Sequence, residues 1–88
     1  MAEQIYLTQY GLMAERHWRE FLPAMVREME ANGTLMEALF EAQEITLDEM
    51  EALTRQLETE QKMTPQQAHD TAWEMIRERY ILLPPEES

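Results

Sequence analysis

The chain has 88 residues, no cysteine, and 18 acidic against 7 basic side chains, which give a formal net charge of −11. A chain of this length forms one domain, here residues 1–88, and without cysteine it can hold neither a disulfide nor a thiolate metal site. Its acidic surface repels phosphate backbones, so we expect no direct binding to DNA or RNA, whereas the charge suits a basic partner protein.

Residues 1–11 form a lead-in segment in our interpretation. They include Ile5, Tyr6, Leu7 and Tyr10, which follow no helical spacing. The segment either lies extended over the helices or frays. Its apolar cluster favours docking, because a free tail is usually more polar.

A first helix is predicted from Leu12 to Asn32. Pro23 falls inside this stretch, where a proline costs about 3 kcal/mol, yet the apolar phase continues through it. We therefore expect one helix kinked at Pro23, with two helices meeting there as the alternative. Gly33 suits the left-handed position that ends a helix. The apolar side recurs at three- and four-residue steps and comprises Ala14, Trp18, Phe21, Leu22, Met25, Val26 and Met29.

The central helix is predicted over residues 34–61, within the longest stretch free of Gly and Pro. Thr34 and Glu37 have the spacing of a capping box at its start. Thr46 and Glu49 have the same spacing and could restart a helix, but the apolar seam keeps its register there, which favours one continuous helix. The seam comprises Met36, Leu39, Phe40, Gln43, Leu47, Met50, Leu53 and Leu57.

A third helix is predicted over residues 65–82. Thr64-Pro65-Gln66-Gln67 combines an N-cap, a proline at the first helical position and a glutamine at the third, which is the clearest local signal in the chain. Lys62-Met63 forms the turn before this helix. Pro84-Pro85 stops the helix, and residues 84–88 are interpreted as a solvated tail.

Short connections between these helices predict antiparallel neighbours, so the expected fold class is all-α, as a three-helix antiparallel bundle. The central helix would span about 42 Å, against about 30 and 27 Å for its neighbours. Because it is too long for either neighbour to cover alone, a homodimer is an open alternative to a monomer.

No catalytic constellation can be assembled from this sequence, so we expect a non-enzymatic protein without a cofactor or metal site. His17 and His69 are the only histidines, and neither has the preceding glutamate that a carboxylate metal site in a bundle uses. We interpret both as partly buried boundary residues. Ser88 is the only serine, and the two separated glycines cannot build a phosphate loop.

No apolar run approaches the roughly 18 residues of a membrane span. The N-terminus also lacks the basic-then-apolar layout of a signal peptide. We therefore expect a cytoplasmic protein without a membrane segment.

Acidic side chains gather on one outer face of the central helix. Like charges three or four residues apart cost roughly 0.2–0.5 kcal/mol per pair, which lysines in these positions would avoid. The row is interpreted either as a solubilising surface or as a docking site for a basic protein. It comprises Glu37, Glu41, Glu44, Asp48 and Glu51, and Arg55 can pair with Glu51 or Glu58.

Arg79 falls on the apolar side of the third helix, where a guanidinium must reach water or find a carboxylate. Glu49 is the candidate carboxylate. The alternative is that Arg79 faces a protein partner between Trp73 and Tyr80, because these three residue types dominate interaction hot spots.

Four stretches carry a family resemblance: Tyr6-Leu7-Thr8-Gln9 with Gly11-Leu12, the helix around Pro23, Gly33-Thr34-Leu35, and the Gln67–Trp73 region. In them the chain resembles the TnpV family of small transposon-encoded proteins. The resemblance implies a helical fold and a mobile-element setting, and it carries over no catalytic residues.

These observations predict a protein that acts by protein–protein contact, through the acidic face and the residues around Arg79. Two alternatives remain. One is a nucleic-acid-mimicking inhibitor that covers a basic nucleic-acid-binding protein, and the other is a purely structural homodimer module.

Overall fold

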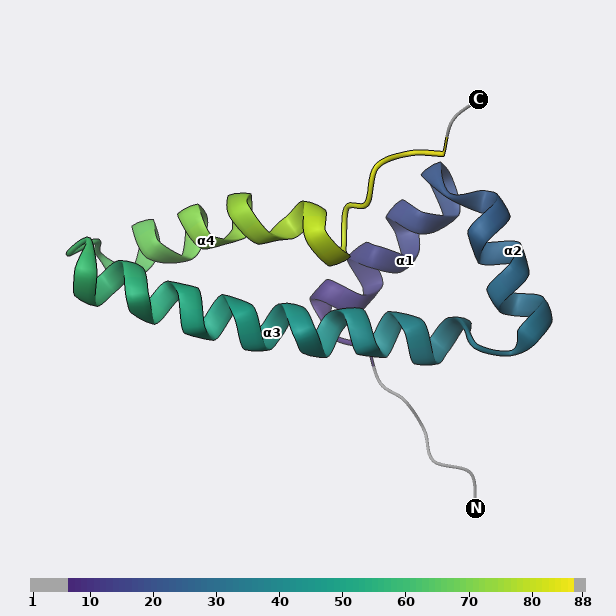
Figure 1. The fold of residues 1–88 in the computed structure, drawn as a ribbon, viewed down its shortest axis with the longest axis horizontal. Coiled ribbons are helices and arrows are strands. Elements are labelled where there is room, and N and C mark those ends of the chain that lie inside the picture. The colour runs from purple at the N-terminus through teal and green to yellow at the C-terminus, as the bar shows by residue number, and fades with distance from the viewer. Residues whose placement is uncertain (1–6, 87–88) are drawn as a thin grey trace, which may run out of the picture.

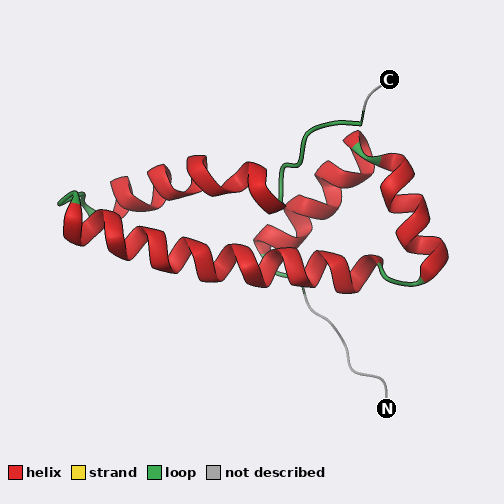
Figure 2. Cartoon of the chain, in the orientation of Figure 1, coloured by secondary structure: helices red, strands yellow, loops and turns green. Residues whose placement is uncertain are grey.

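The computed structural model describes residues 7–86, which contain helices and no strand (Figures 1 and 2). The helices are α1 (Gln9–Phe21), α2 (Pro23–Asn32), α3 (Leu35–Glu60) and α4 (Pro65–Tyr80). α3 runs the length of the molecule, and α4 folds back antiparallel along its C-terminal half. α1, α2 and the N-terminal half of α3 form the sides of a triangle (Figure 1). The all-α class is thus confirmed, but the predicted three-helix antiparallel bundle is not, because the described residues form four helices and only α4 runs back along α3.

The first helical region consists of two helices instead of the single kinked helix that the sequence favours. Leu22 stands between them with φ −133° and ψ 52°, outside the helical range. A residue before proline is pushed out of the α region, and Pro23 is tolerated at the first position of α2, where no N–H is needed. The alternative of two helices meeting at Pro23 is therefore correct. The apolar residues on both sides of the break still face one core, because Trp18, Leu22 and Val26 are all buried.

α1 begins three residues earlier than Leu12, so the predicted lead-in segment is wrong from Gln9 onward. Just before the helix, two residues of the segment contact the rest of the fold. Leu7 packs on the core, and Thr8 donates from its backbone N (2.5 Å) and its hydroxyl (2.9 Å) to Oε1 of buried Gln43. Ile5 and Tyr6 lie outside the described residues.

The chain turns from α2 into α3 at Gly33, as predicted. Gly33 has φ 73°, and two bonds of a Schellman motif close the helix end: Gly33 N–H to Glu30 O (3.2 Å) and Thr34 N–H to Met29 O (2.8 Å). Thr34 therefore belongs to the end of α2, and its side chain caps nothing in α3. The predicted capping box with Glu37 is wrong, while the 26-residue continuity of α3 is confirmed.

The predicted capping box of α4 is present in full. Gln67 N–H donates to the Thr64 hydroxyl (3.2 Å), and the Gln67 side chain accepts from Thr64 N–H (3.1 Å). α4 ends at Tyr80, two residues before the predicted end. The turn before it contains Lys62 at φ 58°, which confirms the predicted turn position.

The two threonines at helix starts give a matched pair for measuring this cap. Thr64→Ala is expected to lower the free energy of unfolding by about 1 kcal/mol, within the range of 0.5–2 kcal/mol for N-caps. Thr34→Ala is expected to change it by less than about 0.5 kcal/mol, because Thr34 makes no cap bond. Urea unfolding followed by circular dichroism measures both. Equal losses would contradict the assignment.

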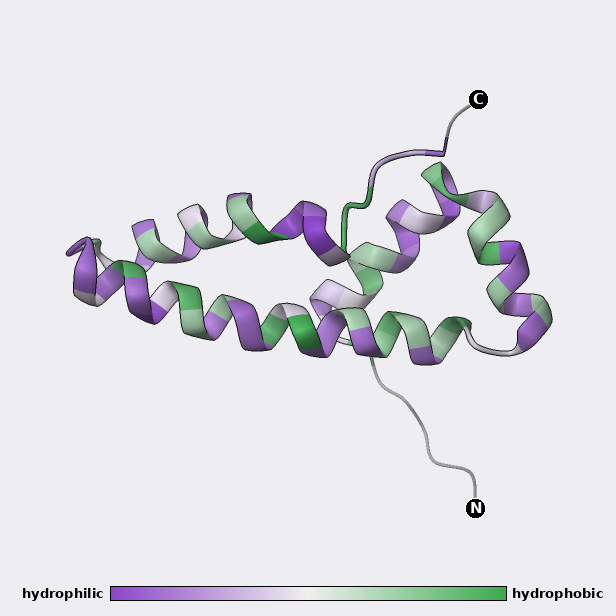
Figure 3. Cartoon of the chain, in the orientation of Figure 1, coloured by the Kyte–Doolittle hydropathy of each residue, from purple (hydrophilic) through white to green (hydrophobic). Residues whose placement is uncertain are grey.

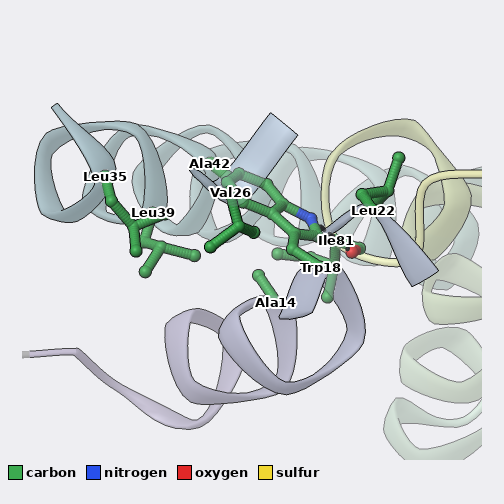
Figure 4. Packing of buried hydrophobic residues seen from close by; sticks show 8 residues of the cluster. All are labelled: Ala14, Trp18, Leu22, Val26, Leu35, Leu39, Ala42 and Ile81. Carbon is green, nitrogen blue, oxygen red and sulfur yellow. Dashed lines mark hydrogen bonds between the residues drawn. The ribbon is translucent and has the colours of Figure 1, made fainter. Parts of the chain in front are cut away.

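Two clusters of buried side chains hold the helices together. The inner core lies where α1, α2 and α3 meet the segment after α4, and Figure 4 draws its members: Ala14, Trp18, Leu22, Val26, Leu35, Leu39, Ala42 and Ile81. The smaller outer core lies between α3 and α4 and contains Met50, Ala72 and Ile76. Ala68 and Ala72 are fully buried, so α4 approaches α3 along small side chains.

The segment after α4 returns to α1 and α2 and forms hydrogen bonds with both helices. Trp18 Nε1–H donates to Ile81 O (3.0 Å), and His17 Nε2 lies 2.7 Å from Leu83 O. The carboxylate of Glu86 accepts from the N–H groups of Ala24 (3.3 Å) and Met25 (3.0 Å) at the start of α2. Glu86 therefore caps α2, which corrects its interpretation as part of a solvated tail.

Candidate partner-binding surface

The acidic row of α3 comprises Glu37, Glu41, Glu44, Asp48 and Glu51, and all five are exposed. Because α3 is unbroken through Ile45 and Thr46, steps of three and four residues keep them on one face. Figure 3 shows hydrophilic and hydrophobic residues alternating along α3, as this geometry requires. Glu51 forms the predicted ion pair with Arg55 (3.1 Å), but both side chains are largely exposed, so water screens the pair.

The buried face of α3 is rotated away from the predicted seam. Leu39, Gln43 and Met50 are buried as expected, but so are Leu35, Ala42 and Thr46 on one flank. On the opposite flank three seam residues are uncovered: Met36, Phe40 and Leu47 are 41%, 39% and 38% exposed. We call these three residues the apolar strip. Ala14 of α1 and Ala42 belong to one buried cluster, and Gly11 of α1 lies close to the Gln43 side chain, so small residues of α1 cover this part of α3.

The apolar strip leads into a surface hollow of about 630 Å³ between α3 and α4. Leu47 and Met50 contribute its apolar lining, and Asp48 and Glu51 of the acidic row stand on its α3 side. His69 forms the α4 wall. His69 has a 56% exposed side chain, so its interpretation as a partly buried boundary residue is wrong.

Arg79 finds the carboxylate that the sequence indicated. Its Nη1 lies 3.0 Å from Oε1 of Glu49, and the Tyr80 hydroxyl donates to Oε2 of the same carboxylate (2.5 Å). Arg79 and Tyr80 also line a second hollow of about 210 Å³, together with Glu41 of the acidic row. The pairing is confirmed, and the Arg79 side chain remains 55% exposed and reachable from solvent.

Trp73 contacts α1. Its ring stacks on Tyr10 of α1, with centroids 5.2 Å apart and planes 20° from parallel, and it packs against both cores. The predicted contact residues therefore occupy three places: the acidic row, the carboxylate cluster of Glu49 with Arg79 and Tyr80, and the contact between α1 and α4.

The Glu49 cluster is expected to appear in the titration of Tyr80. The hydrogen bond to Glu49 raises the pKa of Tyr80 above its ordinary value of 10.0, with smaller contributions from desolvation and the negative charge, while Arg79 lowers it. Glu49→Ala should therefore lower this pKa, and Arg79→Ala should raise it. Subtracting a Tyr80→Phe titration from the phenolate absorbance curve isolates Tyr80. Shifts in the same direction would contradict this arrangement.

The same bond fixes the sign of a pH effect on stability. A tyrosine whose pKa is higher in the folded state stabilises the fold in its neutral form. The contribution is present below pH 10.0 and is lost as pH rises through the higher folded-state value.

His17 is half-buried, as the sequence predicted, and its ring lies beside that of Phe21, with centroids 4.7 Å apart. Its Nε2 forms a hydrogen bond with the carbonyl oxygen of Leu83. Because a carbonyl oxygen can only accept, Nε2 is the donor of this bond. Within residues 7–86, no three His, Asp or Glu side chains are grouped so that they could hold a metal ion.

The apolar strip was not predicted from the sequence, because the heptad pattern places every apolar seam residue on the side expected to be buried. One signal points to it. Leu35 and Ala42 extend the apolar surface beyond the seam on one flank, so a neighbour can cover that flank and leave Phe40 and Leu47 free. Tyr80 as a second donor to Glu49 has no comparable sequence signal.

No helix in the described part of the chain is both long and apolar enough to cross a membrane. Comparisons with protein families, with curated proteins and with solved structures found no match to this chain.

Proposed function

We propose that this chain is a non-enzymatic protein that acts by binding a basic surface of another protein through the acidic row of α3. The observation that supports it is the exposure of all five carboxylates on one continuous helix. Four neighbouring like-charge pairs along this row cost about 1–2 kcal/mol together, which folding alone does not require. The resemblance to TnpV proteins adds a mobile-element setting to the proposal.

The row also supports a second candidate function, a nucleic-acid-mimicking inhibitor. Its carboxylates extend from Glu37 to Glu51, about 21 Å along the helix, and can cover a Lys/Arg surface that otherwise binds phosphates. This candidate predicts that the captured partner loses nucleic-acid binding when the chain is added. A general interaction protein leaves that binding intact.

Neutralising the centre of the row tests the proposal. The triple variant Glu41→Gln, Glu44→Gln, Asp48→Asn removes every like-charge pair in the row. It should raise the free energy of unfolding by about 1–2 kcal/mol at low salt and weaken partner capture. Capture from host lysate, followed by mass spectrometry at low and high salt, identifies proteins that bind through charge.

A matched control removes the same charge elsewhere. Glu20→Gln, Glu28→Gln and Glu78→Gln change three exposed carboxylates on α1, α2 and α4. This control should keep the salt-sensitive partners of the wild type. If the triple variant gains stability and still captures the same proteins, the row serves solubility and the proposed function is wrong.

A further inference from the structure

The apolar strip forms a line along α3. Steps of four and seven residues hold Met36, Phe40 and Leu47 within about 40° of one another around the helix, over about 16 Å of its length. Each keeps more than a third of its surface in solvent. Single exposed apolar residues are ordinary, but three in a row provide the spaced contacts by which a helix recognises another helix.

Carboxylates border this strip on one side. At 100° per residue, Glu37, Glu44 and Glu51 lie about 40–80° further round α3 than the strip. At its C-terminal end, the hollow places Asp48, Glu51 and Glu58 beside Leu47 and Met50. Arg55 also lines the hollow, where it pairs with Glu51 and leaves the carboxylates in excess. An occupant of the strip therefore meets apolar side chains along its centre and negative charge along one edge.

We propose that this surface binds a basic amphipathic helix of a partner protein. Apolar residues of that helix would cover the strip and enter the hollow, and its Lys or Arg side chains would meet Glu44, Asp48 and Glu51. The inference rests on the proposed function and names the element by which the partner docks. It adds an apolar component, which salt does not screen, to the charge attraction of the acidic row.

Charge distinguishes this occupant from a second copy of the chain. Two antiparallel copies of α3 meeting along their strips would bring the same flank of each helix together, so the two acidic rows would face each other. Each copy also carries a formal charge of −11. Like charges across an interface oppose association, whereas a basic helix brings the opposite charge to the carboxylates on that edge.

The test uses a defined probe, a labelled synthetic peptide of about 18 residues, about 27 Å as a helix. It carries leucines at helical spacing and lysines elsewhere, and a scrambled peptide of the same composition is its reference. Binding is measured by fluorescence anisotropy at low and high salt. Phe40→Gln and Leu47→Gln shorten the strip without changing charge, and Met75→Gln is the control, since Met75 is 51% exposed on α4 outside the strip.

The amphipathic peptide should bind the wild type more tightly than the scrambled peptide does and retain that preference at high salt. Each strip variant should weaken its binding about tenfold, and Met75→Gln less than about twofold. Equal binding of the two peptides, no binding, or unchanged binding by both strip variants overturns the inference. If the strip experiment fails but the triple variant of the acidic row still loses its captured partners, the proposed function stands without this inference.

Sedimentation equilibrium tests the second copy directly. The unliganded wild type and Phe40→Gln should both sediment as monomers. A wild-type dimer that dissociates in Phe40→Gln would assign the strip to self-association and overturn the proposed occupant.

Discussion

Replacing Trp18 by alanine is expected to lower the free energy of unfolding by about 3–5 kcal/mol. The Trp18 side chain is 4% exposed in the inner core, and its indole N–H donates to Ile81 O (3.0 Å). The substitution opens a cavity and leaves that carbonyl without its donor. It should also release the segment after α4, since Trp18 joins that segment to α1. A domain of this size holds roughly 4–13 kcal/mol, so the loss is a large share of the total.

Urea unfolding followed by far-ultraviolet circular dichroism measures this effect. Trp18→Phe keeps an aromatic ring without the donor, and should lose less than Trp18→Ala while remaining folded. Leu12→Ala, at a 53% exposed position of the same helix, should change the free energy by less than about 0.5 kcal/mol. A Trp18→Ala loss as small as that of Leu12→Ala would contradict the role of Trp18 as the anchor of the inner core.

Features whose partners lie within a few residues were predictable from the sequence. The Thr64 capping box needs only Gln67, and the end of α2 needs only Gly33 in a left-handed conformation. Thr34 was not predictable in the same way, because two local motifs compete for it. The Schellman motif uses its N–H to close α2, and its φ of −114° and ψ of 3° are not the extended values of an N-cap.

Features that depend on another helix were predictable only in part. Periodicity gives the apolar arc of α3 but not which flank of that arc the neighbours cover. Gly11 of α1 lies close to Gln43, whereas Phe40 and Leu47 are exposed, and no local pattern contains that information. The acidic row was predictable because it lies on a single helix. The pairing of Arg79 with Glu49 was one of two interpretations of an arginine on the apolar side of a helix, and the other was contact with a protein partner.

Gly11→Ala is expected to destabilise the fold, although alanine is the better helix former. A Cβ at Gly11 would stand 2.5 Å from Gln43 Oε1 and 2.8 Å from Leu7 Cδ2. Relieving this contact requires Gln43 to move, and Gln43 is 1% exposed and accepts both bonds from Thr8. Overpacking costs about 1–3 kcal/mol and each lost hydrogen bond about 0.5–1.5 kcal/mol, against a propensity gain of about 1 kcal/mol. With both bonds lost, these contributions give a net loss of about 1–5 kcal/mol.

The second glycine supplies the control for this prediction. Gly33→Ala should also lose about 1–2 kcal/mol, but from its φ of 73°, since nothing lies within 4 Å of the added Cβ. Combining each change with Gln43→Ala separates the two causes. The Gly11 pair should be non-additive by at least about 0.5 kcal/mol, because removing the Gln43 side chain makes room for the methyl group, and the Gly33 pair should be additive. Urea denaturation of the three single and two double variants measures both couplings. A Gly11→Ala variant more stable than the wild type, or additive with Gln43→Ala, would show that α1 does not depend on this close approach to α3.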